Sequence, residues 1–365
     1  MSSSPLASSG ARALSRRSIL GAGGLGLALF LSACSTGPQG SSADTSATPT
    51  TSGEATATDA FPVSIEHVYG TTEIPAEPTR VATVAWVNQD VSLALGVVPV
   101  GMAAVEFGGN DNRSTDWFDA ALAEIDGAEE PAKWSEADGL DFEAIAAVQP
   151  DLILAVYSGI SQEDYDRLSQ IAPTVAYPKD VPAWGTSWQD SVLITGRALG
   201  RTAQAESLVN DLQTQIAETA SQYPALQGAT FLYGTVDPEA AEQISLYTDA
   251  DNRPKFLKSL GMQQAPVIAD NAADDSAFYI TWTPERADEL VSDVLISWAA
   301  SDAVAEAIAA DPLLSQIPAV ANNALVLQVD QQEVLSVSAL SPLSIPVALE
   351  KIVPPIAEAA AATQG

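Results

Sequence analysis

Cys34 and His67 are the only cysteine and the only histidine in this chain of 365 residues. A Ser-His-Asp triad could therefore form only through His67, and a zinc site of histidine and cysteine alone lacks ligands. His67 lies in an alternating run over 65–69, which predicts a half-buried strand and a structural histidine. The sequence contains neither a glycine-rich phosphate-binding motif nor a nucleophile elbow. We expect no catalytic residue, no metal site and no cofactor.

A second group of side chains could bind a ligand by stacking and hydrogen bonding. Aromatic and polar residues follow several predicted strands or precede helices, and in α/β sheets ligands gather at the carboxyl ends of strands. Tryptophan and tyrosine combine an apolar ring with one polar atom, which suits a bulky, partly apolar ligand. The candidates are Trp86, Asn88, Tyr157, Ser158, Trp184, Tyr233, Tyr247, Trp282 and Trp298.

Alternating strands and helices would position these residues. The apolar pattern of the first half predicts strands over 80–85, from 97 and over 151–156, and helices over 90–96 and 140–148. Continuous apolar strands that alternate with helices predict a parallel sheet covered on both faces.

The pattern changes over 188–223, where there is no proline and apolar residues recur at helical intervals. We predict two helices that are broken near Gly200, the second one long. The alternation then resumes, with strands over 229–236, 294–297 and 324–327 and helices over 253–260, 284–291 and 345–361. The fold prediction is α/β: two α/β lobes with mainly parallel sheets, joined by one long α-helix, with a ligand cleft between the lobes.

The N-terminal segment has the order of an export signal. Arg16 and Arg17 precede an apolar stretch over 19–31 that is too short to span a bilayer, and small residues lead to Cys34. This order resembles the lipobox of bacterial lipoproteins, which implies cleavage before Cys34, acylation of that cysteine and a membrane tether. The arginine pair resembles a twin-arginine signal, with the general secretion route as the alternative.

These features divide the chain into five segments. A run rich in Ser, Thr, Ala, Gly and Pro follows Cys34 and predicts a flexible tether. The predicted segments are an export signal over 1–33, lipidated Cys34 with a linker over 34–60, an N-terminal lobe over 61–200, a bridging helix over 201–225 and a C-terminal lobe over 226–365.

The charge balance restricts the partners. Cleavage before Cys34 would remove three of the 15 Lys and Arg residues, leaving 12 against 47 Asp and Glu, a formal charge of −35. This charge excludes nucleic acid as a partner. A strongly anionic ligand would need a local basic cluster, and the sequence contains none.

Several segments resemble, in family order, the substrate-binding lipoproteins of iron-siderophore ABC transporters. The resemblance spans about residues 61–360, and the segments that carry it are 67–75, 78–81, 95–101, 140–155, 171–175, 197–201 and 260–261. It implies an extracytoplasmic, lipid-anchored monomer in which two lobes bridged by one helix hold a ferric siderophore and deliver it to an ABC permease.

The resemblance also implies residue roles. Relatives often contact a chelating oxygen with arginine, which suggests Arg113 and Arg253, and dock one glutamate of each lobe onto permease arginines, which suggests Glu143 and Glu285. With so few basic residues, we expect a neutral or cationic hydroxamate chelate rather than a triply anionic catecholate. A haem or corrinoid binder of the same fold, an acidic secreted hydrolase and a purely structural surface protein remain alternatives.

Overall fold

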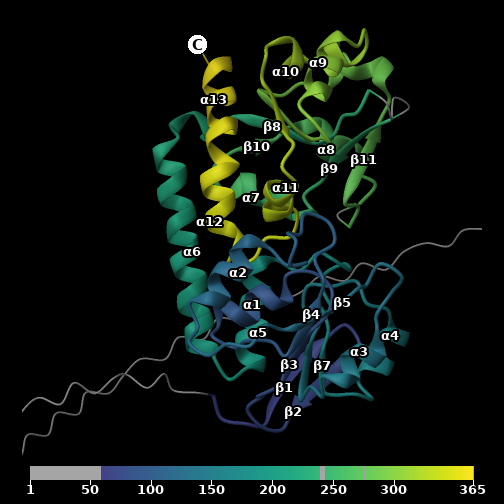
Figure 1. The fold of residues 1–365 in the computed structure, drawn as a ribbon. Coiled ribbons are helices and arrows are strands. Elements are labelled where there is room, and N and C mark those ends of the chain that lie inside the picture. The colour runs from purple at the N-terminus through teal and green to yellow at the C-terminus, as the bar shows by residue number, and fades with distance from the viewer. Residues whose placement is uncertain (1–58, 239–242, 275, 365) are drawn as a thin grey trace, which may run out of the picture. The chain divides into compact units, whose positions relative to one another are not determined.

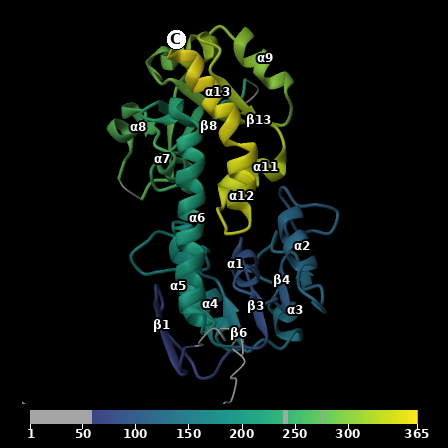
Figure 2. The ribbon, with the colours of Figure 1, turned by 90° about the vertical axis from the view of Figure 1, so that its left-hand side faces the viewer.

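The computed structural model describes residues 59–238, 243–274 and 276–364, which belong to one compact unit. It contains two sheet-bearing lobes, and a long helix, α6, runs beside both of them (Figures 1 and 2). In Figure 1 the first lobe lies below the second, which is drawn in green and yellow. The predicted export signal, Cys34 and the linker up to residue 58 lie outside the described residues.

The first lobe is built on a fully parallel sheet. Four of its strands are buried at every residue, as expected for strands that are covered on both faces. The spatial order is β5 (Ala132–Trp134), β4 (Gly101–Ala103), β3 (Val81–Thr83), β6 (Leu152–Leu154) and β7 (Thr174–Val175). The parallel sheet predicted for this part of the chain is confirmed.

Side-chain caps set where several helices of this lobe begin. Thr115, Asp141, Ser161 and Ser187 each accept a hydrogen bond from a backbone N–H of the first helical turn, which satisfies one of the free donors there. The first lobe contains the helices α1 (Asn88–Ala94), α2 (Asp116–Ala123), α3 (Phe142–Ala147), α4 (Gln162–Leu168) and α5 (Trp188–Ala198).

His67 lies in an antiparallel hairpin of β1 (Val63–His67) and β2 (Gly70–Ile74). Its Nε2 lies 2.9 Å from Oγ1 of Thr72, and its Nδ1 accepts a hydrogen bond from the N–H of Tyr69. Burial lowers the pKa of His67. Both ring nitrogens are therefore occupied, and the prediction of a structural histidine is confirmed.

Helix α6 (Thr202–Gln222) connects the lobes. Its buried residues are Ala205, Val209, Leu212, Ile216 and Ala220, spaced three or four positions apart as on one face of a helix. Its 21 residues extend about 31 Å at 1.5 Å per residue. The break before α6 falls at Gly200, with a φ of +69°, as predicted.

Two contacts fix the start of α6. A Cβ atom at Gly196 would lie 2.3 Å from Cβ of Ala205, so this glycine allows α5 and α6 to cross closely. The carboxylate of Asp59 accepts hydrogen bonds from the N–H and the hydroxyl of Thr202. Asp59 falls in the predicted linker, yet it already contacts the body of the protein.

The second lobe has a mixed sheet. Strands β8, β10, β12 and β13 pair in parallel, whereas β9 pairs antiparallel with both β8 and β11. The order is β11 (Tyr279–Trp282), β9 (Ile244–Tyr247), β8 (Thr230–Thr235), β12 (Val294–Trp298) and β13 (Leu325–Gln328), and β10 (Gln263–Gln264) also pairs with β8. The three predicted strands are present, but the antiparallel edge was not predicted.

Two predicted helices of this lobe differ from the structure. The segment 345–361 forms two helices, because Pro354 and Pro355 lie in the first turn of a new one. The segment 284–291 contains a short 3₁₀ helix in which Arg286 is non-helical. The carbonyl of Arg286 accepts a hydrogen bond from the indole of Trp282 at 2.8 Å. The helical segments are η1 (Pro224–Leu226), α7 (Asn252–Ser259), α8 (Pro266–Asn271), η2 (Pro284–Glu289), α9 (Ala303–Ala310), η3 (Leu314–Gln316), α10 (Pro318–Ala321), α11 (Gln331–Ser338), α12 (Ser344–Lys351) and α13 (Val353–Thr363).

One apolar cluster extends through both lobes. It contains Leu152 of the first sheet, Leu212 of α6, Phe231 of the second sheet and Ile345 of α12. Because moving the lobes apart would expose part of this cluster to water, we expect small rotations rather than wide opening. Within the described part of the chain, no helix is both long and apolar enough to cross a membrane.

A carboxylate anchors the second sheet and provides a stability test. Oδ2 of Asp293 accepts hydrogen bonds of 2.7 Å from both the N–H and the hydroxyl of Thr230, at the start of β8. We expect Asp293→Ala to lower the free energy of unfolding by about 2 kcal/mol, because partly buried donors lose their acceptor. Denaturant unfolding would measure it. Asp270→Ala, at an exposed position of α8, should change it by less than about 0.5 kcal/mol.

Candidate functional site

The larger of two adjacent cavities between the lobes, here called the aromatic cavity, has a volume of about 580 Å³. This size falls within the range of small-molecule sites. Both lobes contribute its walls, since residues from before and after α6 line it. Its aromatic and basic side chains are Trp86, Tyr157, Trp184, Tyr247, Arg253, Phe278 and Tyr279.

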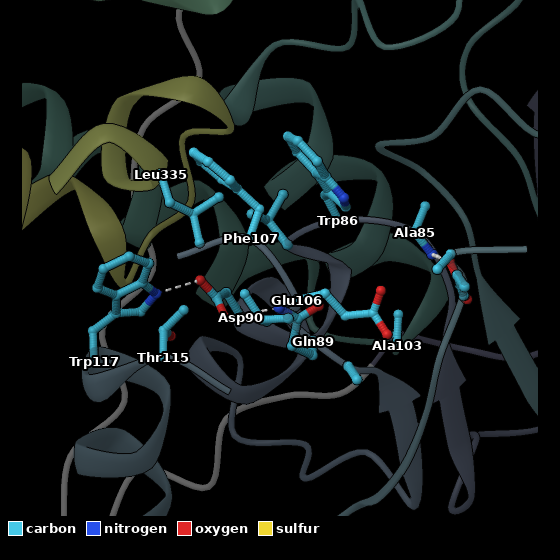
Figure 3. Close-up of a pocket in the computed structure, with 15 residues that line it drawn as sticks. Ala85, Trp86, Gln89, Asp90, Ala103, Glu106, Phe107, Thr115, Trp117 and Leu335 are labelled. Atoms are coloured by element: carbon cyan, nitrogen blue, oxygen red, sulfur yellow. Dashed lines mark hydrogen bonds between the residues drawn. The ribbon is translucent and has the colours of Figure 1, made fainter. Parts of the chain in front are cut away.

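The smaller cavity, here called the acidic cavity, has a volume of about 260 Å³. It includes Gln89, Asp90, Glu106 and Phe107 of the first lobe and Leu335 of α11 (Figure 3). The two cavities adjoin, because Ala85, Trp86 and Glu136 line both of them.

The cavities lie at the carboxyl ends of the first sheet. Trp86 follows β3, Glu106 follows β4, Glu136 follows β5 and Tyr157 follows β6. Because the strands are parallel, these loops converge at one edge of the sheet. The sequence predicts the binding site at this edge of an α/β lobe.

The loop that carries Trp86 has an unusual backbone. Ala85 and Val87 have φ values of 60° and 57°, a left-handed conformation that is rare for residues other than glycine and rarest for a β-branched one. Asn88 supports the loop: its Nδ2 donates to the carbonyls of Val84 and Tyr157, at 2.8 and 3.0 Å, and its Oδ1 accepts from the N–H of Tyr157. The tryptophan ring is 46% exposed as a result.

Three aromatic rings form one wall of the aromatic cavity. The centroid of Trp184 lies 5.9 Å from that of Trp86 and 5.8 Å from that of Tyr157, both in inclined arrangements. Trp184 is 40% exposed, so two indole faces are available to stack against a ligand. Burial raises the pKa of Tyr157 to about 12, and its phenol therefore stays protonated and can donate a hydrogen bond.

Arg253 supplies a fixed positive charge to the aromatic cavity. Its Nε and Nη2 donate to the two carboxylate oxygens of Asp251 at 2.8 and 2.7 Å, and its guanidinium lies 3.6 Å from the centroid of the Tyr247 ring. Burial acts to lower the pKa of Arg253, but the hydrogen bonds and charge of Asp251 outweigh it and raise that pKa. The guanidinium is therefore always charged and held in one orientation.

The predicted binding residues divide into three groups. Trp86, Tyr157, Trp184, Tyr247 and Arg253 line the aromatic cavity. Trp298 lines neither cavity but lies next to one lining residue of each, since its Nε1 donates to the hydroxyl of Tyr247 at 3.2 Å and its ring lies 6.2 Å from Phe107. The remaining predicted ligand contacts, Asn88, Arg113, Ser158, Tyr233 and Trp282, lie elsewhere.

Four of these remaining residues are buried and lie outside the linings of both cavities. The side-chain amide of Asn88 is engaged in the hydrogen bonds described above, and the hydroxyl of Ser158 donates to the carbonyl of Ala155. Tyr233 lies in the core and donates to Oε1 of Gln328 at 2.5 Å. Trp282 packs in the core of the second lobe.

The fifth residue, Arg113, is exposed outside both cavities. Its Nη2 lies 3.3 Å from Oε1 of Glu106. The prediction that Arg113 contacts the ligand does not agree with this placement, because the side chain is directed to a carboxylate at the rim of the acidic cavity.

The remaining predicted residues are the two docking glutamates, Glu143 and Glu285, and the lipidation site, Cys34. Glu143 and Glu285 are exposed in the first turns of α3 and η2. Cys34 lies outside the described residues. Among residues 59–364, apart from the undescribed 239–242 and 275, no group of three or more His, Cys, Asp or Glu is placed to hold a metal ion.

Several lining residues were not predicted. Glu106 and Phe107 follow β4, and Glu136 follows β5, so the strand-end rule would have found them had β4 been delimited correctly and β5 been predicted. Asp251 is the N-cap of α7, accepting from the N–H of Arg253. The sequence indicates this ion pair, because an aspartate stands two residues before a predicted helix that begins with an arginine.

A family model described as periplasmic binding protein matches residues 81–330. Among solved structures, that of PiaA from Streptococcus pneumoniae TIGR4 in complex with ferrichrome is similar to this chain. It is 32% identical, the match covers 82% of this chain and 99% of PiaA, and the TM-score is 0.75.

Two curated proteins are also similar to this chain. YhfQ of Bacillus subtilis, whose name describes an ABC transporter substrate-binding lipoprotein, is 27% identical over 58% of this chain and 61% of its own length. FepB of Escherichia coli, a ferric enterobactin-binding periplasmic protein, is 31% identical over 50% of this chain and 57% of its own. This chain spans between 51% and 65% of the length of the curated relatives that it matches.

Proposed function

The chain belongs to the periplasmic binding protein family, and from this premise we propose that it captures a ferric siderophore outside the cytoplasm and delivers it to an ABC permease. The family binds solutes and does not transform them, which agrees with a site of stacking and hydrogen-bonding groups. The observation that supports the ligand class best is the aromatic cavity, which is lined by two exposed tryptophans and a single fixed guanidinium.

The charges around the cleft favour a neutral or cationic hydroxamate chelate. Arg253 is the basic residue of the aromatic cavity, and Asp251 already balances its charge. Glu136 and Asp164 add negative charge to the same lining. A ferric tricatecholate carries a charge of about −3 and would be repelled here, whereas a ferric trihydroxamate is neutral. PiaA, with its bound ferrichrome, is a relative matched over nearly its whole length.

The remaining parts of the proposal concern location and delivery. We propose that the signal over 1–33 directs export, by the twin-arginine or the general secretion route, and that lipid on Cys34 holds a monomer at the cell membrane. The lipoprotein name of YhfQ supports this anchoring. Glu143 and Glu285, one on each lobe, are proposed to dock onto basic residues of the permease.

Fluorescence titration tests the proposed ligand class. Ferrichrome should quench the tryptophan emission of the purified protein with a Kd of about 1 μM or tighter, because Trp86 and Trp184 face the ligand. Ferric enterobactin should bind at least about tenfold more weakly. Tight binding of the catecholate without any response to ferrichrome would refute the hydroxamate preference, and haem is the control for a different ligand class.

A further inference from the structure

The acidic cavity presents acceptors and aromatic faces to whatever fills it. Asp90, Glu106 and Glu136 contribute carboxylates, and none of the described residues that line the cavity is lysine, arginine or histidine. Figure 3 shows the rings of Trp86 and Phe107 across the cavity from Gln89 and Asp90. The chemistry of this lining differs from that of the aromatic cavity, which contains Arg253.

Asp90 is a buried carboxylate without a cationic partner. It is 1% exposed, and its Oδ2 accepts hydrogen bonds from Nε1 of Trp117 at 2.8 Å and from the hydroxyl of Ser341 at 2.6 Å. Burial raises the pKa of Asp90 to about 6, against the lowering effect of these hydrogen bonds. At neutral pH the group is thus mostly charged, and no positive side chain contributes to its surroundings.

Gln89 provides an independent observation. It is 3% exposed and lines the cavity, and its Nε2 donates to Oδ1 of Asp90 at 3.3 Å. Its Oε1 is buried and accepts no hydrogen bond from any described residue. Buried acceptors are nearly always paired, so a ligand N–H donor in the cavity would satisfy this oxygen.

The other two carboxylates have partial partners. Glu136 accepts hydrogen bonds from the N–H of Ala85 at 2.9 Å and from Nε1 of Trp134 at 3.0 Å. Its pKa is raised by burial and by the nearby charge of Glu106. Glu106 accepts from the hydroxyl of Ser135 and lies 3.3 Å from Arg113, in an ion pair that is about half exposed on both sides. Arg113 therefore offsets part of the charge of Glu106, although such an exposed pair contributes little to stability.

A small organic cation fits this lining better than a metal ion. No described group of three or more His, Cys, Asp or Glu could hold a metal. The aromatic faces of Trp86, Phe107 and Trp117 would instead suit an ammonium with an alkyl stem. Because Trp86 and Glu136 also line the aromatic cavity, one ligand could occupy both.

We propose that the acidic cavity binds a protonated amine arm of the ferric hydroxamate whose iron-chelating part lies in the aromatic cavity. This inference rests on the proposed function and narrows it, because it names chelates with a primary ammonium group as preferred ligands. The arm would donate to Oε1 of Gln89 and lie close to Asp90 and Glu136.

Paired chelates test the inference. Ferrioxamine B is a trihydroxamate with a free primary amine, and its N-acetylated derivative has the same iron centre without the charge. We expect the purified protein to bind ferrioxamine B about tenfold more tightly than the acetylated chelate. Tryptophan quenching measures both, and ferrichrome serves as the amine-free reference.

Variants then locate the preference. Glu106→Gln and Glu136→Gln should each reduce the affinity ratio of the two ferrioxamines by about threefold, because each removes one charge near the ammonium. The matched control is Glu163→Gln on α4, which removes the same charge at an exposed position away from both cavities.

The outcomes separate this inference from the proposed function. Equal binding of the two ferrioxamines, with ferrichrome also bound, would overturn the amine site and leave the hydroxamate function intact. A preference that Glu163→Gln reduces as much as the cavity variants would reflect overall charge and would also overturn it. Failure of all three chelates to bind would overturn both proposals.

Discussion

Replacing Arg253 with glutamine is expected to weaken binding of a ferric hydroxamate by about 100-fold. The variant would lose one charge-assisted hydrogen bond to a ligand oxygen, together with the electrostatic attraction of the guanidinium. Arg253 is the guanidinium of the aromatic cavity, and Asp251 and the ring of Tyr247 hold it in place. The variant would also leave the carboxylate of Asp251 facing the chelate. Tryptophan quenching with ferrichrome would measure the change.

Arg113 offers the matched control, because family resemblance suggests the same role for both arginines. Arg113→Gln removes an equal charge from a side chain that is 49% exposed and lies outside both cavities. We expect its effect on ferrichrome affinity to stay within about twofold. A larger loss for Arg113→Gln than for Arg253→Gln would show that the aromatic cavity is not the site of the chelate.

Arg253→Gln should also reduce stability, which must be separated from its effect on binding. Asp251 is buried, with an 8% exposed side chain, and an uncompensated buried charge costs about 3 kcal/mol. The double variant Asp251→Asn with Arg253→Gln removes both charges and should recover most of this stability, as followed by thermal unfolding. Ferrichrome affinity should stay low in the double variant, because the guanidinium remains absent.

Strand ends are the part of the site that the sequence predicts best. Trp86 and Tyr157 follow short apolar runs that are bounded by polar or turn residues, and these runs form β3 and β6. The hydrophobic pattern alone determines that such runs are buried, and parallel pairing then brings their carboxyl ends together. Arg253 was predicted from family resemblance, and its position at the start of α7 agrees with its place in the cavity.

Two predicted ligand contacts depend on where the residue lies in its element. Tyr233 lies within the predicted strand over 229–236 and inside β8, so its side chain packs in the core instead of lining a cavity. Helix α1 begins at Asn88 instead of Asp90, and the asparagine therefore bonds to the backbone. Boundaries depend on tertiary contacts, which local patterns do not contain.

The acidic cavity could not be predicted from one sequence. Asp90 meets Ser341, which is 251 positions away along the chain, and this contact depends on how α11 and α12 pack against the first lobe. The antiparallel edge of β9 and β11 was missed for a related reason. Each strand has only four residues, and Tyr247 and Tyr279 become neighbours only through pairing across the sheet.

Reversing the charge of Glu143 and Glu285 together is expected to abolish delivery while sparing ligand capture. Both side chains are exposed, and neither forms an ion pair with a described residue. They lie outside both cavities. If they dock onto permease arginines, Glu143→Arg with Glu285→Arg places like charges in contact, which costs several kcal/mol. We expect uptake of radiolabelled ferrichrome to fall by more than about tenfold.

The chain contains a closely matched control pair, because Glu163 and Glu306 are also exposed glutamates in the first turns of helices, one in each lobe. Glu163→Arg with Glu306→Arg changes the net charge by the same amount and also places positive charges in first helical turns, so equal loss of uptake in both double variants would reject docking at Glu143 and Glu285. The docking variant must retain ferrichrome affinity in solution, since a binding defect would explain lost uptake without the permease. Each single docking variant should show an intermediate uptake rate, because one lobe would still make its contact.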